Sequence, residues 1–438
     1  MNRQKIISQI AEEYPNKTED SIKKLVRRRK KIDEKYFIVK NFKNDREGFD
    51  ISQFNEDNII LLTYYQHILK SSFKVKMPNR NHIIDELLNI APYVNKYNEQ
   101  TIYKFDLKSF YKSVDVNLVV KKIAQNQYLY SNEINFISTT FSNLDSLFPG
   151  IGIINYMVEI LGQDFDITVK NIFKDSLVFY SRYIDDCILI LDKQFDKSVL
   201  ENILTIEIKK HFGNEAKFNE SKSCFINLSS SEKFDYLGYL FQYDIKVLQN
   251  GKRKCSFLFG VASKKIVKEK ERVKKIVTAY QKDLNEELLF TRLDLYFKRL
   301  VYLNKKMDWE VRGISQTYSE AKKLLQWDKT RMEYYSTSLI PETYSFFKGE
   351  FLKDIFRDLN LLYPQKIENQ VMNGKFSTNL ALNKAVVLHQ KVGYNHQMLY
   401  DILNSLDLQI DTSMSYRQLA SIYKKEVYNL QNNKPRNK

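Results

Sequence analysis

The chain of 438 residues is long enough for two or three domains, and its hydrophobic content of 43% indicates a globular protein with large cores. Lysine and arginine outnumber aspartate and glutamate by 69 to 53, which together with 29 tyrosines and 28 phenylalanines favours a nucleic-acid partner, although an AT-rich genome inflates the same residue types. Three widely spaced cysteines argue against a disulfide framework, and no apolar run is long enough to span a membrane. We therefore expect a cytoplasmic protein with no membrane partner.

The N-terminal half of the chain mixes strand and helix patterns. Residues 1–50 are predicted to be a basic helical extension, in which the charge run SIKKLVRRRKK is a solvated face. In residues 51–245 the segment TIYKFDLKSF is predicted to be a strand, and NLVVKKIAQN, IINYMVEILGQDFD and KSVLENILTIEIKKHF are predicted to be helices. This order predicts an α+β fold with a split βαβ sheet and helices on one of its faces.

Past residue 260 the pattern becomes helical. Apolar residues recur with helical spacing in two stretches, 289–303 and 352–362. The segment LALNKAVVLHQKVG is rich in helix formers, and Gly393 at its end is typical of a helix C-cap. We therefore predict that residues 306–438 form an all-α C-terminal domain.

The stretch SLVFYSRYIDDCILILDKQF places two adjacent acids between two strand-forming runs. An ordinary hairpin turn explains the polar interruption. It does not explain the residue types, because a two-residue hairpin turn usually contains glycine and because the carboxylates of Asp185 and Asp186 repel each other. A bound cation would account for both features.

A second acid follows an apolar strand earlier in the chain, where Asp106 stands in the segment YKFDLKSFYKSVD. By itself, an acid at the end of a strand is an ordinary solvent-facing residue. Phosphoryl transfer with two metal ions, however, requires carboxylates from separate segments that converge on cations about 3.5–4 Å apart. The combination of Asp106 with Asp185 therefore predicts such a site.

Four motifs over residues 60–305 resemble those of reverse transcriptases, in the order that this family has. DLKSFYKSVD resembles the first palm motif, YIDD the Tyr-x-Asp-Asp hairpin, NESKSCF the lysine motif, and FDYLGYLF the Leu-Gly grip beside the primer end. The resemblance implies a right-hand polymerase with fingers and palm in residues 51–245, a thumb in 246–305, and the helical domain in 306–438. It also implies two Mg²⁺ ions as cofactors, which Mn²⁺ can replace.

The resemblance also implies roles for individual residues. It assigns catalysis to Asp106, Asp185, Asp186 and Lys222, with Lys222 as proton donor to pyrophosphate. It assigns the metal ions to the three aspartates and to the backbone carbonyls of Phe105 and Leu107. It assigns substrate binding to Tyr111 as the gate against a 2′-hydroxyl, and to Lys74, Lys76, Arg80 and Gly150, with the segment FKVKMPNRNH as a fingers strand.

Nucleic-acid binding is expected in the thumb. The segment SKKIVKEKERVKKIVTAYQKD places its basic residues on one helical face and Val273, Ile276, Val277 and Tyr280 on another, a profile typical of a helix that tracks a phosphate backbone, although a solvated face would look the same. The expected contacts are Lys264, Lys268, Arg272 and Lys275, together with Tyr236 and Gly238 of the grip motif.

One motif departs from the family. The second palm motif of reverse transcriptases reads Leu-Pro-Gln-Gly with a serine four residues later, whereas here Pro149 replaces the glutamine and Ile154 replaces the serine, while Gly150 and Asp166 keep their places. Because these positions touch the templating base pair in the family, we expect untemplated or repetitive synthesis, primed from a nucleic acid or from a protein hydroxyl.

The helical C-terminal domain and the altered motif most resemble the abortive-infection and defence-associated reverse transcriptases of bacteria. This resemblance implies dNTPs as substrates, a DNA product, an RNA template or non-coding RNA, a second defence protein and a homo-oligomeric assembly. Two alternatives remain open. One is a retron-type or group II intron-type enzyme that copies a dedicated RNA. The other is a catalytically inert nucleic-acid-binding scaffold, although such a scaffold has no reason to keep a cluster of uncompensated acids.

Overall fold

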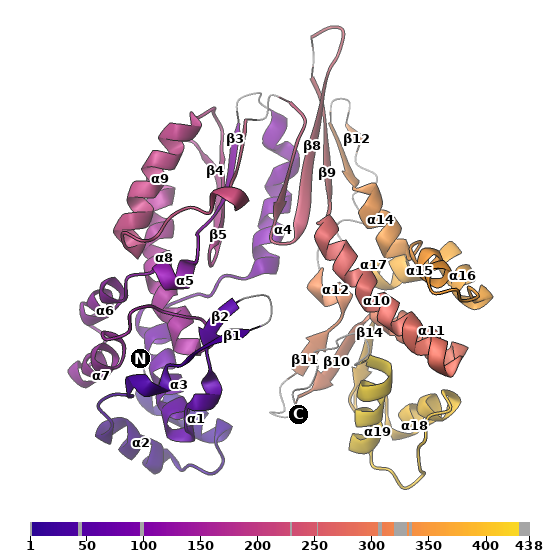
Figure 1. Ribbon diagram of the computed structural model, residues 1–438, viewed down its shortest axis with the longest axis horizontal. Coiled ribbons are helices and arrows are strands. Elements are labelled where there is room, and N and C mark those ends of the chain that lie inside the picture. Colours follow the sequence, from indigo (N-terminus) through magenta and orange to yellow (C-terminus); the bar gives the residue numbers. More distant parts are fainter. Residues whose placement is uncertain are drawn as a thin grey trace. The chain divides into compact units, whose positions relative to one another are not determined.

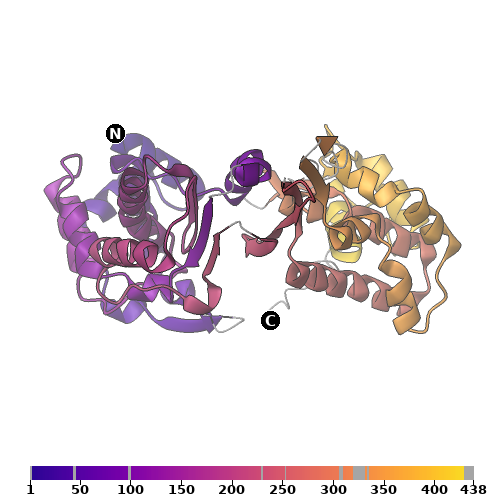
Figure 2. The same ribbon diagram turned by 90° about the horizontal axis from the view of Figure 1, so that it is seen from above.

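The computed structural model describes residues 2–42, 46–96, 100–227, 230–251, 253–304, 309–318, 331–332 and 335–428. The chain forms two compact units, coloured from indigo to magenta and from red to yellow for most of their length (Figures 1 and 2). Unit 1 comprises Met1–Ile83 and Val94–Ser229, and unit 2 comprises Ile84–Tyr93 and Ser230–Lys438. The limits predicted at residues 50, 245 and 305 stay predictions.

The N-terminal residues belong to the core of unit 1. Helices α1 (Arg3–Glu13) and α2 (Glu19–Arg28) form as predicted, but β1 (Val39–Phe42) and β2 (Arg46–Phe49) then pair as an antiparallel hairpin. The buried isoleucines of both helices join the same hydrophobic cluster as α3 (Glu56–Ser72). The prediction of a helical extension is therefore wrong for the hairpin residues, and α1 and α2 are part of the core because the apolar stripe on each helix has to be covered and α3 covers it.

Unit 1 contains one four-stranded sheet. Its strands are β3 (Thr101–Asp106), β4 (Leu177–Tyr183), β5 (Asp186–Leu191) and β6 (Cys224–Asn227), in the order β4-β5-β3-β6. All neighbouring strands are antiparallel, so β3 and β4 run in the same direction with β5 between them. This is the split βαβ arrangement predicted from the order of the segments.

Helices connect the strands of this sheet and cover one of its faces. Between β3 and β4 the chain forms α5 (Phe110–Ser113), α6 (Val116–Ala124), α7 (Ser131–Phe141) and α8 (Gly152–Ile172), and α9 (Lys197–Phe212) follows β5. Figure 1 shows α8 and α9 on the same side of the sheet. The fold is therefore α+β, as predicted.

The strand pleat decides which side chains face these helices. Tyr103 and Phe105 of β3 and Leu189 of β5 belong to the same buried cluster as the apolar residues of α9. Because successive side chains of a strand point to opposite faces, Asp106 and Asp186 point away from this helix layer. Their acidic groups are thus kept out of the apolar core.

Unit 2 contains a five-stranded sheet in the order β12-β13-β9-β8-β7, in which β12 spans Arg331–Met332. Strands β7 (Glu232–Tyr236), β8 (Tyr239–Val247) and β9 (Arg253–Val261) form antiparallel pairs, and β13 (Tyr335–Leu339) adds to β9 in parallel. The two-residue turn between β7 and β8 has positive φ at both Leu237 and Gly238. This is the geometry of a type I′ turn, and it explains the glycine of the grip motif.

A second sheet in unit 2 corrects the prediction for the C-terminal region. Strand β10 (Arg299–Leu303) pairs with β11 (Trp309–Arg312) and, in parallel, with β14 (Ala385–Leu388). Residues 306–438 are therefore not all-α. Helical spacing after Leu289 continues by coincidence past the end of helix α11 (Glu286–Tyr296) into β10, and short apolar runs do not distinguish a strand from a helix.

Gly393 has a different role from the one predicted. It ends no helix, and a Cβ built on it would lie 2.1 Å from the carbonyl oxygen of Val387 in β14. The glycine therefore allows the close approach of two backbone segments. The remaining α-helices of the described residues are α4 (Arg80–Ile90), α10 (Ser263–Asp283), α12 (Ile314–Thr317), α14 (Pro341–Lys348), α15 (Leu352–Asp358), α16 (Gln365–Met372), α17 (Lys375–Ala381), α18 (His396–Ser405) and α19 (Tyr416–Ile422).

Candidate active site

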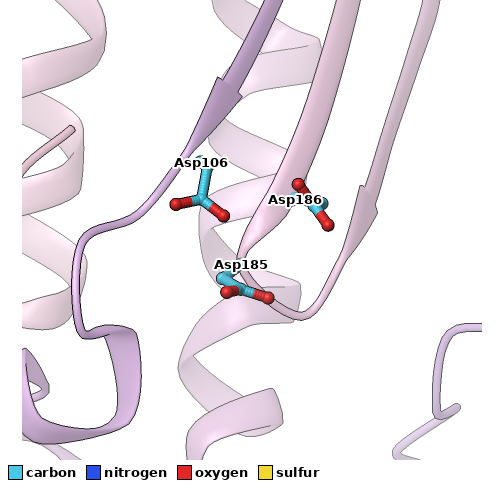
Figure 3. Close-up of side chains that lie close together, drawn as sticks. All are labelled: Asp106, Asp185 and Asp186. Carbon is cyan, nitrogen blue, oxygen red and sulfur yellow. The ribbon is translucent and has the colours of Figure 1, made fainter. Parts of the chain in front are cut away.

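Three aspartates meet at one end of the unit 1 sheet (Figure 3). Asp106 is the last residue of β3 and stands opposite Asp186, the first residue of β5, while Asp185 lies in the turn before it. One oxygen atom of each carboxylate lies within 4.8 Å of the others. The predicted convergence of acids from two separate segments is therefore present.

The turn that carries Asp185 has an unusual backbone. Only Ile184 and Asp185 lie between β4 and β5, and Ile184 has φ +61. A β-branched residue in this left-handed region is strained, and such strain is typical of functional sites. The backbone amide of Leu107 donates to the carbonyl oxygen of Asp185 at 3.1 Å, so the turn is bound directly to the chain that follows β3.

The cluster carries excess negative charge. The pKa of Asp185 is raised to about 6, first by burial and then by the like charges of Asp186 and Asp106. The ammonium group of Lys222 lies 3.2 Å from both carboxylate oxygens of Asp106. Lys222 thus offsets part of the negative charge of the cluster.

Asn219 is a site residue that the sequence analysis missed. Its side-chain amide donates to Oδ1 of Asp106 at 2.9 Å, and its backbone amide donates to the carbonyl oxygen of Asp106 at 2.7 Å. Asp106 is only 3% exposed, so these bonds orient a carboxylate that bulk water hardly reaches. The signal in the sequence is that Asn219 begins the same NESKSCF motif that contains Lys222.

Tyr111 lies beside the acidic cluster. Its pKa is raised to about 12, first by burial and then by the charge of Asp185. Its hydroxyl donates to Oδ1 of Asn155 at 2.9 Å, which holds the ring in place. Tyr111 is half-buried, so part of its surface remains available to a ligand.

In the second palm motif, the residue at position 154 does not lie where it could contact a template, contrary to what the family resemblance implies. Ile154 is fully buried in the core of unit 1, so its side chain cannot contact a templating base, and the residue that meets Tyr111 is its neighbour Asn155. The carbonyl oxygen of Pro149 accepts from the amide of Phe49 at 2.7 Å. Gly150 has φ +119, and a Cβ on it would lie 2.5 Å from the carbonyl oxygen of Phe49. Gly150 is thus required by the backbone, and its role in substrate binding stays a prediction.

The two backbone positions beside Asp106 are held firmly. Phe105 pairs with Cys187 across β3 and β5, and Leu107 forms a bridge with Phe218. Both side chains are buried. The structure thus fixes the path of the chain through the site, and metal binding by the two carbonyl groups stays a prediction.

The predicted fingers strand does not form. Residues 73–79 are irregular, and Arg80 begins α4. Lys74 and Lys76 are exposed and line a cavity of about 910 Å³ with Lys122 and Asp164, whose side chains form an ion pair. The described residues that line this cavity include none of the three aspartates, so a role of these lysines at the triphosphate is not supported. Pro78 accounts for the interrupted strand, because proline lacks a backbone donor.

The basic helix predicted for nucleic-acid binding is α10 of unit 2. Lys268 and Lys275 are exposed, and Lys264 is exposed with its ammonium group 3.7 Å from Asp235. Arg272 differs, because its guanidinium donates at 2.6 Å to Glu269, a buried acid of the same helix. Three of the four predicted cations are therefore presented to solvent, while Arg272 compensates a buried charge.

The grip motif FDYLGYLF forms the tight turn between β7 and β8. Tyr236 is only 1% exposed, which corrects the prediction that its ring offers a surface to nucleic acid. Gly238 in this turn accepts from the amide of Ala262 through its carbonyl oxygen at 3.1 Å, and its contact with nucleic acid stays a prediction.

We expect Lys268→Ala with Lys275→Ala to weaken binding of a primer duplex about equally for all sequences, because phosphate contacts carry no base information. The slope of log affinity against log salt should fall by about 0.7–0.9 for each lost phosphate contact. Fluorescence anisotropy at several salt concentrations measures it. Lys391→Ala with Arg417→Ala, two exposed cations elsewhere in unit 2, is the control for net charge. Equal affinities for both double variants would remove α10 from the interface.

The acidic cluster fits magnesium. Hard oxygen ligands from carboxylates are those that Mg²⁺ prefers. The three carboxylates share one neighbourhood, burial and the like charges of Asp186 and Asp106 raise the pKa of Asp185, and the Lys222 ammonium already lies beside Asp106, where a cation is attracted. The residues that would hold the ions are Asp106, Asp185 and Asp186.

No family model matches the sequence, and no curated protein sequence matches it. Among solved structures, the chain is similar to telomerase from Candida albicans in complex with a fragment of telomeric RNA, at 13% identity and a TM-score of 0.34 over 85% of this chain and 56% of that one. It is also similar to apo telomerase from Candida tropicalis, at 12% identity and a TM-score of 0.34 over 85% and 59% of the two chains.

A form of the Candida tropicalis telomerase truncated from the C-terminal domain is similar at 16% identity and a TM-score of 0.28, over 44% of each chain. The chain thus spans about half the length of these telomerase chains. Among the described residues, none of the helices combines the length and the apolar character that crossing a bilayer requires.

Proposed function

We propose that the chain is a reverse-transcriptase-type DNA polymerase that adds dNTPs to a primer with two Mg²⁺ ions. The observation that carries this proposal is the convergence of Asp106, Asp185 and Asp186 within 4.8 Å at a strand end and a strained hairpin turn. Four motifs in the family's order support it. The crowding of like charges argues against the alternative of an inert scaffold. It contributes to raising the pKa of Asp185 to about 6, and such a cluster costs stability unless a cation offsets its charge.

In the proposed reaction the primer 3′-oxygen forms a bond to the α-phosphorus of the dNTP. The bond from that phosphorus to the bridging oxygen breaks, and pyrophosphate leaves. When bound, the metal ions would make the 3′-hydroxyl proton easier to pass to solvent water and would offset the charge on the phosphates. Asp106 and Asp185 hold the ions in place, and Asp186 completes the cluster.

Two further residues act on the substrate in this proposal. The ammonium group of Lys222, which contacts Asp106, would donate a proton to the leaving pyrophosphate. The side chain of Lys222 is 58% exposed, so its ammonium group is accessible to that leaving group. Tyr111 places its ring against the 2′ position of the sugar and excludes a hydroxyl there.

We expect Tyr111→Val to raise ribonucleotide incorporation relative to deoxyribonucleotide incorporation by about 10- to 100-fold, because removal of the ring makes room for the 2′-hydroxyl. Parallel primer-extension assays with rNTPs and dNTPs measure this ratio. Tyr111→Phe is the matched control, since it keeps the ring and loses only the bond to Asn155. Unchanged selectivity in Tyr111→Val would show that another residue forms the gate.

The choice of template is tested with a defined RNA of mixed sequence, a DNA primer and all four dNTPs, followed by sequencing of the DNA with and without protease treatment. Because Ile154 is buried, its replacement of serine removes no surface contact, and the main argument for unfaithful synthesis loses its support. Accurate complementary DNA would identify a template-copying enzyme of the retron or intron type. Homopolymeric or repetitive DNA released only by protease would identify untemplated synthesis primed by the protein.

We further propose that this activity serves bacterial defence against phage, on the strength of the family resemblance. Cells that carry the gene are challenged with a panel of phages beside cells that carry the Asp185→Asn variant. Protection by the original protein and its loss in the variant would support the proposal. Equal plaque numbers for both across the panel would contradict it.

A further inference from the structure

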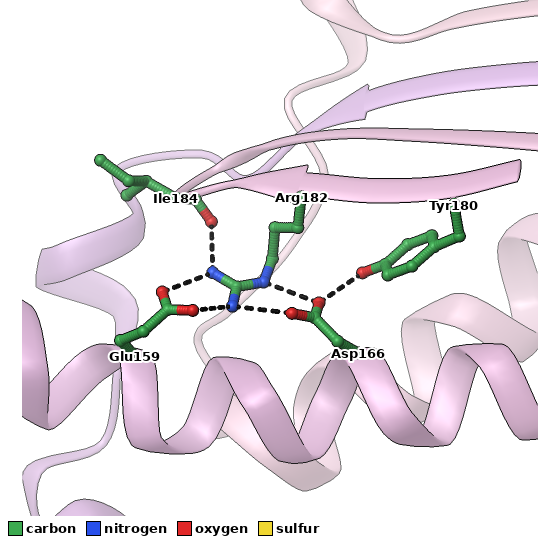
Figure 4. A network of polar contacts seen from close by, with 5 residues as sticks. All are labelled: Glu159, Asp166, Tyr180, Arg182 and Ile184. Atoms are coloured by element: carbon green, nitrogen blue, oxygen red, sulfur yellow. Dashed lines mark hydrogen bonds and ion pairs between the residues drawn. The ribbon is translucent and has the colours of Figure 1, made fainter. Parts of the chain in front are cut away.

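Arg182 of β4 lies entirely inside unit 1, beneath the turn that carries Asp185 (Figure 4). Its side chain is 0% exposed, and all of its N–H groups are bonded. Nε and Nη2 donate to the two oxygens of Asp166 at 2.8 and 3.0 Å, and Nη2 and Nη1 donate to the two oxygens of Glu159 at 2.7 and 3.0 Å. The last donor of Nη1 reaches the carbonyl oxygen of Ile184 at 3.1 Å.

The two acids come from one helix and hold the guanidinium in a single orientation. Glu159 and Asp166 lie seven residues apart in α8, so both project from the same face of that helix. Tyr180 donates to Asp166 at 2.7 Å and orients that carboxylate in turn. Burial of an ion pair is weak evidence for stabilisation, because the loss of hydration offsets the attraction. Stability alone therefore does not explain why these charges are buried.

The hydrogen bond from Arg182 to the carbonyl oxygen of Ile184 offers an explanation for the buried network. The carbonyl group of Ile184 belongs to the peptide bond that leads into Asp185, and Ile184 holds a strained φ of +61. The carbonyl group on the other side of Asp185 is held by the amide of Leu107. Both peptide groups that flank Asp185 are thus anchored, one of them by a buried arginine.

Gly162 shows that the chain makes room for this arginine. It lies within α8, where glycine destabilises a helix relative to alanine, and its backbone does not have the positive φ that would require glycine. A Cβ at this position would lie 2.3 Å from Nη2, 2.5 Å from Cζ and 2.8 Å from Nη1 of Arg182. The guanidinium group of Arg182 therefore occupies the space that a side chain at position 162 would need.

We propose that Arg182 is a positioning residue, which together with Glu159, Asp166 and Gly162 holds the Ile184–Asp185 peptide group so that the Asp185 carboxylate is kept in place to bind a divalent cation. This inference rests on the proposed function, because it assigns a metal to Asp185. The need to hold Asp185 in place would account for the strained turn at Ile184, for the glycine at position 162 and for the buried charge of Arg182.

The experiment measures Mn²⁺ binding to the whole protein by electron paramagnetic resonance, without nucleotide or primer. We expect Gly162→Ala to weaken binding about 10- to 100-fold, the usual effect of a change behind a metal ligand. Helix propensity alone predicts that alanine stabilises α8 and leaves binding unchanged. Gln163→Ala, at the next position of the same helix, is the matched control and should bind Mn²⁺ as the original protein does.

A second variant covers the case in which alanine at position 162 prevents folding. Arg182→Met with Glu159→Gln removes one positive and one negative charge, so the net charge of the network stays the same, while the bond to Ile184 is lost. We expect a cooperative thermal transition together with Mn²⁺ binding weakened about 10- to 100-fold. Binding within about twofold of the original protein, in this variant or in a folded Gly162→Ala protein, would overturn the inference.

Mn²⁺ binding by the aspartate variants distinguishes a failure of the proposed function from a failure of the positioning role. If Asp185→Asn and Asp106→Asn bind Mn²⁺ like the original protein, the acidic cluster is not the metal site, and both proposals are overturned. If these two variants lose Mn²⁺ binding while the Gly162 and Arg182 variants keep it, the proposed function stands and only the positioning role of Arg182 is rejected.

Discussion

Asparagine in place of Asp185 or Asp106 is expected to abolish dNTP incorporation. Each carboxylate that holds a metal ion contributes several kcal/mol of charge stabilisation in the transition state, so the rate should fall by about 10³-fold or more. The amide has nearly the same shape as the carboxylate, and the amide oxygen of Asp106→Asn can still accept the bond that Asn219 donates. Both variants should therefore keep the fold.

Primer extension in Mg²⁺ with all four dNTPs measures this effect, and circular dichroism checks the fold. Asp192→Asn is the matched control, because Asp192 is exposed directly after β5, at the opposite end of the strand from Asp186. The control should extend the primer at the original rate. Full extension by Asp185→Asn or Asp106→Asn would end the polymerase proposal.

The second large effect concerns stability in the absence of metal. Because the pKa of Asp185 is about 6 in the folded protein and 3.8 ordinarily, the folded state binds its proton more tightly than the unfolded chain does. The favourable contribution of this group is therefore complete below about pH 4 and is lost as the pH rises through about 6. The difference corresponds to at most about 3 kcal/mol in the free energy of unfolding.

Urea unfolding in EDTA between pH 4.5 and pH 8 measures this contribution. The stability of Asp185→Asn should exceed that of the original protein by less at pH 4.5 than at pH 8, since the amide carries no charge. Mg²⁺ added at pH 8 should stabilise the original protein, by about 2.7 kcal/mol at a hundred times its dissociation constant, and should have little effect on the variant. Parallel stability curves for the two proteins would show that Asp185 is not destabilised by its neighbours.

Local sequence patterns were sufficient to predict the acidic site. The runs on either side of Asp185 and Asp186 predict a hairpin, and the apolar run before Asp106 predicts a neighbouring strand. Both inferences depend on residues that are adjacent in the chain. The split βαβ order then places the strand end beside the hairpin, as the structure shows.

Contacts between distant segments decided the rest of the site. Asn219 bonds to Asp106 from 113 residues away and Asn155 bonds to Tyr111 from 44 residues away, and neither pairing leaves a periodic signal. The altered palm motif instead indicated Ile154, which lies next to Asn155 but points into the core. Adjacent residues of a helix differ by about 100° in direction, so a one-residue difference separates a core side chain from a site side chain.

The α+β character of the chain, the helices that follow β3 and β5, and the acids of the site could be predicted from short segments of sequence, because hydrophobic periodicity and short motifs are properties of neighbouring residues. The pairing of β14 with β10, the burial of Tyr236 and the space that Gly162 leaves for the guanidinium of Arg182 became visible in the folded chain alone. Burial and strand pairing depend on contacts between distant segments, so the same apolar run forms a strand or a helix according to what covers it.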